Sequence, residues 1–173
     1  MVWRSVRDAE TRGSNPRTPT RFINLFKKMN YIIYKWHSYL DMPKYDRQWH
    51  KKDVADEFAE LKEAKGVINK WSELSDVCYT YTRALWSGHK NIKLPINYFC
   101  YLLGLTYMFP KFYLRWKFFD DLGKKINKNV KIREVRNPQK IDKLEIIADK
   151  YSLDKKIFIK EAKNLKKQRF FLK

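Results

Sequence analysis

The chain has 173 residues, of which 38 are Lys or Arg and 19 are Asp or Glu, so its formal net charge is +19. The length is that of one ordinary domain with a real core, and an aromatic content of 16% with six Trp excludes a disordered basic tail. The charge indicates a polyanionic partner, which would be a nucleotide, a nucleic acid or an anionic membrane surface.

Residues 1–28 differ in composition from the rest of the chain. The stretch RDAETRGSNPRTPT has no hydrophobic periodicity and predicts a loop or disorder. Residues 13–20 resemble the translated 3′ half of a transfer-RNA gene. We therefore expect a mis-assigned upstream start, with the natural protein beginning at Met29. The alternative is a basic targeting extension, which Asp8, Glu10 and the lack of a sustained apolar face disfavour.

The next part of the chain predicts two long helices. Residues 31–39 are apolar and aromatic and predict a short helix or strand, and residues 41–46 predict a turn. An amphipathic helix is predicted over about residues 49–65, with Gly66 as its stop. A second is predicted over about residues 70–86. The apolar stripes of these two helices predict a common core.

The second half of the chain also favours helices. Residues 96–109 are too short to span a membrane and predict a buried core helix that breaks at Pro110. Residues 112–126 predict a half-buried helix with its cations outside, and residues 128–136 predict an extended segment. Residues 137–173 predict a basic pair of helices with a turn between them.

The predicted fold class is all-α, a helical bundle built on a two-helix carboxylate hairpin with a basic C-terminal helical pair. We expect a helical core over residues 29–127 and the basic pair over residues 128–173. The only cysteines, Cys78 and Cys100, lack metal-ligand spacing and indicate free thiols in a reducing compartment. We therefore expect a cytoplasmic protein without a transmembrane segment.

Two pairs of carboxylates carry the strongest chemical signal. Glu57 and Glu60 lie on the first long helix, and Glu73 and Asp76 lie on the second. Residues three apart share one side of a helix, and both pairs flank the apolar stripe with the same handedness. Antiparallel helices would gather four like charges, which a hard cation such as Mg²⁺ or Mn²⁺ would neutralise. The alternative is a set of solvated acids paired with nearby Lys and Arg.

The strings DEFAE (residues 56–60) and ELSDV (residues 73–77) resemble the two Glu-x2-Glu/Asp helices of the MazG-like all-α nucleoside triphosphate pyrophosphohydrolases. The resemblance covers about residues 51–83. It implies that Glu57, Glu60, Glu73 and Asp76 hold Mg²⁺ on a triphosphate, which an activated water cleaves to nucleoside monophosphate and pyrophosphate. Ser72 stands where many members of that family carry an acid.

Cations and aromatic residues supply the candidates for nucleotide binding. Arg83 is the first candidate for a phosphate contact, and Trp49 and Trp71 are candidates for stacking on a base. Three weaker candidates for phosphate contacts are Lys111, Arg115 and Lys117. Each of these has an ordinary alternative as a solvated charge or a packing anchor. We expect a homodimer, because two helices per chain need partners to complete a bundle core.

Two other functions compete with this hydrolase. The first is a basic helical nucleic-acid-binding protein without catalytic activity, which the Lys-rich C-terminal pair favours. The second is a peripheral membrane protein, since residues 98–119 are aromatic and followed by cations, as in an interfacial helix. The ordinary reading of that stretch is a bundle core or a dimer interface.

Overall fold

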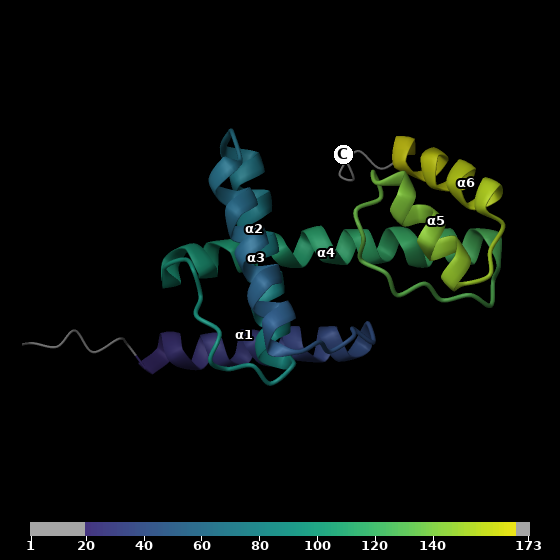
Figure 1. Cartoon of the computed structure of the whole chain (residues 1–173). Helices are drawn as coiled ribbons and strands as arrows, with labels where there is room; N and C mark the ends of the chain where they lie inside the picture. Colours follow the sequence, from purple (N-terminus) through teal and green to yellow (C-terminus); the bar gives the residue numbers. More distant parts are fainter. Residues whose placement is uncertain (1–19, 169–173) are drawn as a thin grey trace, which may run out of the picture.

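The computed structural model describes residues 20–168, with their side chains described over residues 28–167. Regular secondary structure within this range is entirely α-helical, so the predicted all-α class is confirmed. In chain order the helices are α1 (Thr20–Tyr39), α2 (Arg47–Glu63), α3 (Val67–Trp86), α4 (Tyr98–Ile126), α5 (Ile141–Lys150) and α6 (Lys155–Gln168) (Figure 1). No helix among them is both long and apolar enough to cross a membrane.

The N-terminal helix α1 includes residues 31–39, so the helical alternative is correct there. Met29 lies within α1, and residues 1–19 lie outside the described part of the chain. The mis-assigned start therefore stays a prediction.

Helices α2 and α3 lie side by side and are joined by only three residues. The Asp46 side chain accepts a hydrogen bond from the backbone N–H of Trp49 at 2.8 Å and caps the start of α2. Gly66 has a φ of +80°, which glycine adopts without strain, and this conformation allows the abrupt turn into α3. The short connection places the acids of α2 beside those of α3.

Helix α4 runs through Pro110, so the predicted break at this residue is wrong. Proline cannot donate a backbone hydrogen bond to the carbonyl of Thr106. Both residues are exposed, so water can satisfy that carbonyl instead. Buried residues on either side of the proline, including Met108 and Phe112, hold the helix against one continuous core.

Two hydrophobic clusters meet along α4. The first joins α1 and α3 to the N-terminal half of α4, and its buried side chains include Ile33, Cys78, Tyr79, Tyr101 and Leu105. The second joins the C-terminal half of α4 to α5 and α6, and its buried side chains include Phe118, Phe119, Leu122, Leu144 and Phe158. Among the described helices, only α4 packs against both α3 and α6 (Figure 1). It therefore sets the position of α5 and α6 relative to α2 and α3.

The connection between α4 and α5, residues 127–140, has no regular secondary structure. Ile132 is buried in the second cluster and Val135 in the first. The neighbouring Arg133 and Arg136 are exposed. This connection therefore bridges the two clusters.

Helices α3 and α4 approach closely at Gly104. A Cβ at this position would lie 2.4 Å from Cys78 Sγ and 3.0 Å from the Leu74 carbonyl oxygen. We expect Gly104→Ala to lower the free energy of unfolding by about 1 to 3 kcal/mol, as overpacking does, measured by urea denaturation. Adding Cys78→Ala should recover part of the loss, because it removes the nearer atom. Wild-type stability of Gly104→Ala would contradict the close approach.

Two histidines are fully buried beside Arg83. Burial, followed by the Arg83 charge, lowers the pKa of His37 to about 3 and the pKa of His50 to about 4, from 6.5. Below about pH 6.5 the two histidines are protonated in the unfolded chain but stay neutral in the folded one. Protons therefore favour unfolding, and the free energy of unfolding should fall as the pH drops from about 6.5 toward 4. His50→Leu should weaken this loss in thermal melts between pH 4 and 7. A variant with the wild-type pH profile would contradict the assignment.

Candidate metal and polyphosphate site

Three carboxylates from α2 and α3 converge. One oxygen each of Glu57, Glu60 and Glu73 lies within 4.8 Å of the other two. Glu57 and Glu73 are half-buried, whereas Glu60 is exposed. Three of the four predicted ligands are thus brought together in this structure.

Two of these carboxylates, Glu57 and Glu73, have raised pKa values. Burial, then the charges of Asp76, Glu60, Asp53 and Glu73, raise the pKa of Glu57 to about 8. The pKa of Glu73 is raised chiefly by burial, with Asp76 adding to the shift and Lys111 opposing it. A divalent cation at this point would favour the charged carboxylates, and its binding would release protons near neutral pH.

Asp76, the fourth predicted ligand, is engaged elsewhere. Its Oδ2 accepts a hydrogen bond from Lys111 Nζ at 2.5 Å, and the Lys111 side chain is only 7% exposed. The same ammonium donates to the carbonyl oxygen of Ser72 at 3.0 Å and to its Oγ at 2.9 Å. The expectation that Asp76 joins the other three acids is not met here, because a buried ammonium holds its carboxylate.

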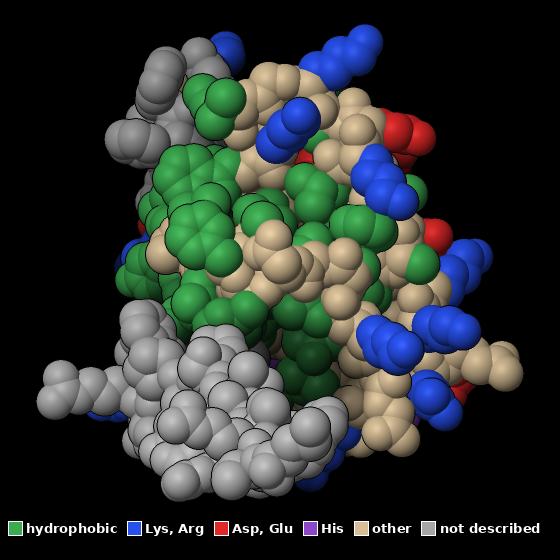
Figure 2. Space-filling model, turned by 90° about the vertical axis from the view of Figure 1, so that its left-hand side faces the viewer, with side chains coloured by type: hydrophobic (Ala, Val, Ile, Leu, Met, Phe, Trp, Pro, Cys, Tyr) green, Lys and Arg blue, Asp and Glu red, His purple; other side chains and the backbone are tan. Residues whose placement is uncertain are grey.

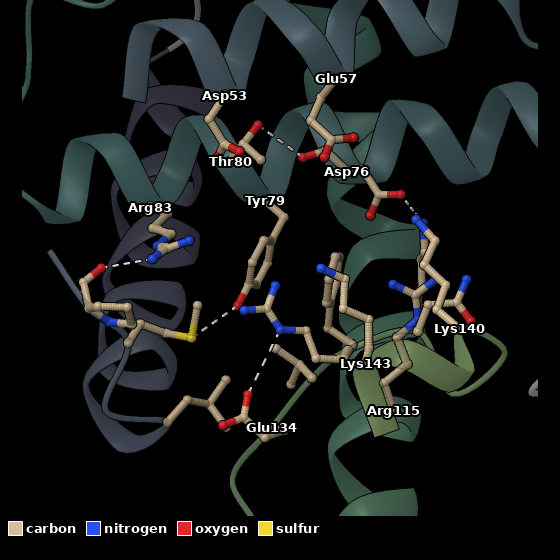
Figure 3. Close-up of a pocket in the computed structure, with 18 of the residues that line it drawn as sticks. Asp53, Glu57, Asp76, Tyr79, Thr80, Arg83, Arg115, Glu134, Lys140 and Lys143 are labelled. Carbon is tan, nitrogen blue, oxygen red and sulfur yellow. Dashed lines mark hydrogen bonds and ion pairs between the residues drawn. The ribbon is translucent and has the colours of Figure 1, made fainter. Parts of the chain in front are cut away.

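The carboxylates open onto a cavity of about 640 Å³ that reaches from α2 and α3 to α4, the 127–140 connection and α5. Its acidic lining residues are Asp41, Asp53, Glu57, Glu60, Glu73, Asp76 and Glu134. Its basic lining residues are Arg83, Lys111, Arg115, Arg133, Arg136, Lys140, Lys143 and Lys150. Figure 3 shows Asp53, Glu57 and Asp76 along one side, with Lys140, Lys143 and Glu134 across from them. One side of the cavity is therefore rich in acids, and the side formed by α5 and the 127–140 connection is mainly basic.

Arg83 and Trp49 line this cavity and contact each other. The Arg83 guanidinium lies 5.0 Å from the Trp49 ring centroid and 5.1 Å from that of Tyr45. Its Nη2 donates to the Pro43 carbonyl oxygen at 2.8 Å, which ties α3 to the turn before α2. Its Nε has no hydrogen-bond partner among the described residues. The predicted phosphate contact and the predicted stacking residue thus form one cation–aromatic group.

The other predicted binding residues divide between two places. Arg115 lines the cavity, and burial lowers its pKa. Trp71 is not among the lining residues, because its indole stacks on Tyr107 and its Nε1 donates to the Leu103 carbonyl oxygen at 3.2 Å. Lys117 pairs with Asp121 at 3.1 Å and is also absent from the lining. The structure does not bring these last two to the carboxylates.

The cations that α5 contributes to the cavity were missed from the sequence. Lys143, Ile147 and Lys150 lie at helical spacing on α5, and all three line the cavity. That spacing marks a shared helix face, but it does not say which distant element the face meets. Only the packing of α6 on α4 and of α5 on α6 brings these cations opposite the acids.

Comparisons with protein-family models, with curated proteins and with solved structures found no match for this chain.

Proposed function

We propose that this protein is a metal-dependent pyrophosphohydrolase that cleaves a nucleoside triphosphate, ribo or deoxy, to its monophosphate and pyrophosphate. The observation that carries the proposal is the convergence of Glu57, Glu60 and Glu73 on a cavity lined by cations. The three carboxylates could bind a divalent ion, and the Lys and Arg side chains of the cavity could bind the phosphates that carry that ion. The motif resemblance over residues 51–83 supports the same activity.

The donor set favours a hard cation. All three converging groups are carboxylates, and oxygen donors select Mg²⁺ or Mn²⁺ over softer metals. Glu57, Glu60 and Glu73 would hold the ion, and Asp76 would join them only on leaving Lys111. When bound, such an ion neutralises phosphate charge and makes water more acidic.

The remaining side chains position the nucleotide. Lys111 and Arg115 lie beside the carboxylates and add positive charge where pyrophosphate would leave. Tyr45 and Trp49 offer aromatic surface for a base, with the Arg83 cation against both rings. Together these groups would bind the triphosphate and the base at different parts of one cavity.

The test is a panel of ribo- and deoxyribonucleoside triphosphates, assayed for pyrophosphate release with Mg²⁺ or Mn²⁺ and again with EDTA. We expect release from at least one nucleotide, lost in EDTA and in Glu73→Ala. The matched control is Glu63→Ala, which removes an exposed acid outside the cavity lining. Absence of release from every nucleotide, or full activity of Glu73→Ala, would refute the proposal.

We also propose a homodimer. Val67 and Ile68 at the start of α3 and Phe99 at the start of α4 are each at least 74% exposed. Figure 2 shows hydrophobic side chains gathered on the side of the molecule where α4 begins in Figure 1. A second copy would cover such an apolar surface. Sedimentation velocity should show a dimer that Phe99→Asp converts to a monomer, and a monomeric wild-type protein would refute this proposal.

A second candidate function is nucleic-acid binding through α6. Lys156, Lys160 and Lys163 are exposed along this helix and are absent from the cavity lining. Cations at this spacing could follow a phosphate backbone. Binding that survives EDTA, weakens with salt and is unchanged by Glu73→Ala would support this second function.

A further inference from the structure

We infer that Arg136, Lys140 and Lys143, here called the basic wall, bind the phosphate chain of a polyphosphate ligand whose divalent cation is held by the opposite carboxylates. This inference rests on the proposed function, and it assigns a role to the C-terminal part of the chain. The ligand class is a metal-bound polyphosphate, as in a nucleoside triphosphate.

The Lys and Arg residues that α5 and the 127–140 connection contribute to the cavity differ in how closely they pair with other side chains. Lys150 Nζ is 2.5 Å from Glu134 Oε1, and the Arg133 guanidinium lies 5.3 Å from the Tyr39 ring centroid. Arg136 Nε is 4.0 Å from Glu134 Oε2, at the limit of an ion pair. Lys140 and Lys143 form no salt bridge within residues 28–167. The basic wall therefore has positive charge that the protein itself does not neutralise.

On the acidic side Asp76 pairs with Lys111, but Glu57, Glu60 and Glu73 form no salt bridge among the described residues. These three carboxylates and the basic wall line the same cavity. Figure 3 shows Lys140 and Lys143 across the opening from Glu57. The carboxylates and the basic wall therefore do not neutralise each other in this structure. A ligand between them must carry both signs of charge.

A metal-bound polyphosphate meets this requirement. Its cation matches the carboxylates, and its closely spaced phosphate oxygens match several Lys and Arg donors at once. A nucleic-acid backbone has a lower charge density and would have to thread through a cavity that α4, α5 and the 127–140 connection border. The geometry therefore favours a polyphosphate chain over a phosphodiester strand.

The fold presents the wall on a packed support. On α5, Ile147 is only 2% exposed and belongs to the second hydrophobic cluster, whereas Lys143, one turn earlier, is exposed and lines the cavity. Val135, next to Arg136, is buried in the first cluster. Buried neighbours therefore anchor both segments of the wall.

The test uses the full chain and inorganic tripolyphosphate with Mg²⁺, measured by isothermal titration calorimetry. Lys140→Ala/Lys143→Ala should weaken binding by about tenfold to a hundredfold, because each lost charge-assisted contact is worth about tenfold. The control Lys90→Ala/Lys93→Ala removes the same charge from the connection between α3 and α4, outside the cavity lining, and should bind as wild type does. All the substituted lysines are exposed, and circular dichroism would verify folding.

Each outcome separates this inference from the proposed activity. Unchanged tripolyphosphate binding in Lys140→Ala/Lys143→Ala, with pyrophosphate release intact in the wild type, would overturn the inference alone. Wall-dependent tripolyphosphate binding without hydrolysis of any nucleotide would support the inference and overturn the activity. Wall-dependent binding of a single-stranded oligonucleotide that tripolyphosphate does not displace would overturn the inference in favour of nucleic acid.

Discussion

Glu57→Gln should lower metal-dependent pyrophosphate release by about a hundredfold or more, the scale expected when one oxygen donor of a catalytic metal is lost. Glu57 is half-buried and lies within 4.8 Å of both partner carboxylates. The substitution keeps the shape but places an amide N–H₂ where a cation needs an oxygen. Steady-state rates at saturating Mg²⁺ would measure the loss, with Glu63→Gln on the same helix as the control. Activity within about twofold of wild type would refute a ligand role.

The same substitution should change how metal-free stability depends on pH. The folded pKa of Glu57 is raised to about 8 from 4.5, so the folded chain retains a proton that the unfolded chain releases. This group's contribution to stability therefore declines as the pH rises from about 4.5 to about 8. In EDTA, Glu57→Gln should melt above the wild type at pH 8 and close to it at pH 4.5. Parallel melting profiles would show that the carboxyl is not perturbed.

At pH 8, Mg²⁺ should make the wild type melt at a higher temperature than Glu57→Gln, which reverses their order in EDTA. A ligand that binds only the folded state raises the melting temperature, and the rise grows as the ligand concentration exceeds its Kd. At pH 8, where the carboxylates can be charged, Mg²⁺ should stabilise the wild type and Glu63→Gln. It should stabilise Glu57→Gln far less. Equal stabilisation of all three proteins would place the ion elsewhere.

Lys111→Met should lower the free energy of unfolding by about 2 to 3 kcal/mol, somewhat below the loss typical of a fully buried ion pair. Methionine keeps the length of the side chain but leaves the Asp76 carboxylate, only 19% exposed, without its cation. Urea denaturation in EDTA would measure the loss. Asp76→Asn should cost less, because Lys111 keeps both Ser72 oxygens as acceptors.

The control for Lys111→Met is Lys117→Met, which removes a 38% exposed ammonium from the same helix. Exposed pairs contribute little, so this variant should stay within about 1 kcal/mol of wild type. Without Lys111, Asp76 is available to a metal, so Mg²⁺ should restore more stability to Lys111→Met than to Lys117→Met. Equal effects of the two substitutions would mean that the Lys111–Asp76 pair is not the buried contact described above.

Local sequence patterns predicted the helices and the acidic pairs. Helical periodicity needs only neighbouring residues, and the spacing of Glu57, Glu60 and Glu73 was enough to place them on facing sides of adjacent helices. The prediction failed at Pro110, where burial on both sides outweighs one missing hydrogen bond. Burial depends on elements distant in the chain, which local patterns do not report.

Contacts between residues distant in the chain could not be predicted from the sequence either. Asp76 has the right type and spacing for a metal ligand, yet its partner is an ammonium 35 residues away. Lys140 and Lys143 belong to a Lys-rich segment that reads equally well as a solvated or nucleic-acid-binding surface. Their placement on the cavity follows from the packing of α6 on α4 and of α5 on α6, which no single segment encodes.

The width of the cavity depends on helix α4. This helix supports the acids through α3 at one end and the cations through α6 and α5 at the other. Pro110 leaves one backbone hydrogen bond unmade between those ends. Met108 and Phe112, on either side of Pro110, are both buried in the first cluster, so side-chain packing rather than the backbone ladder fixes α4, and with it the width of the cavity, at this point.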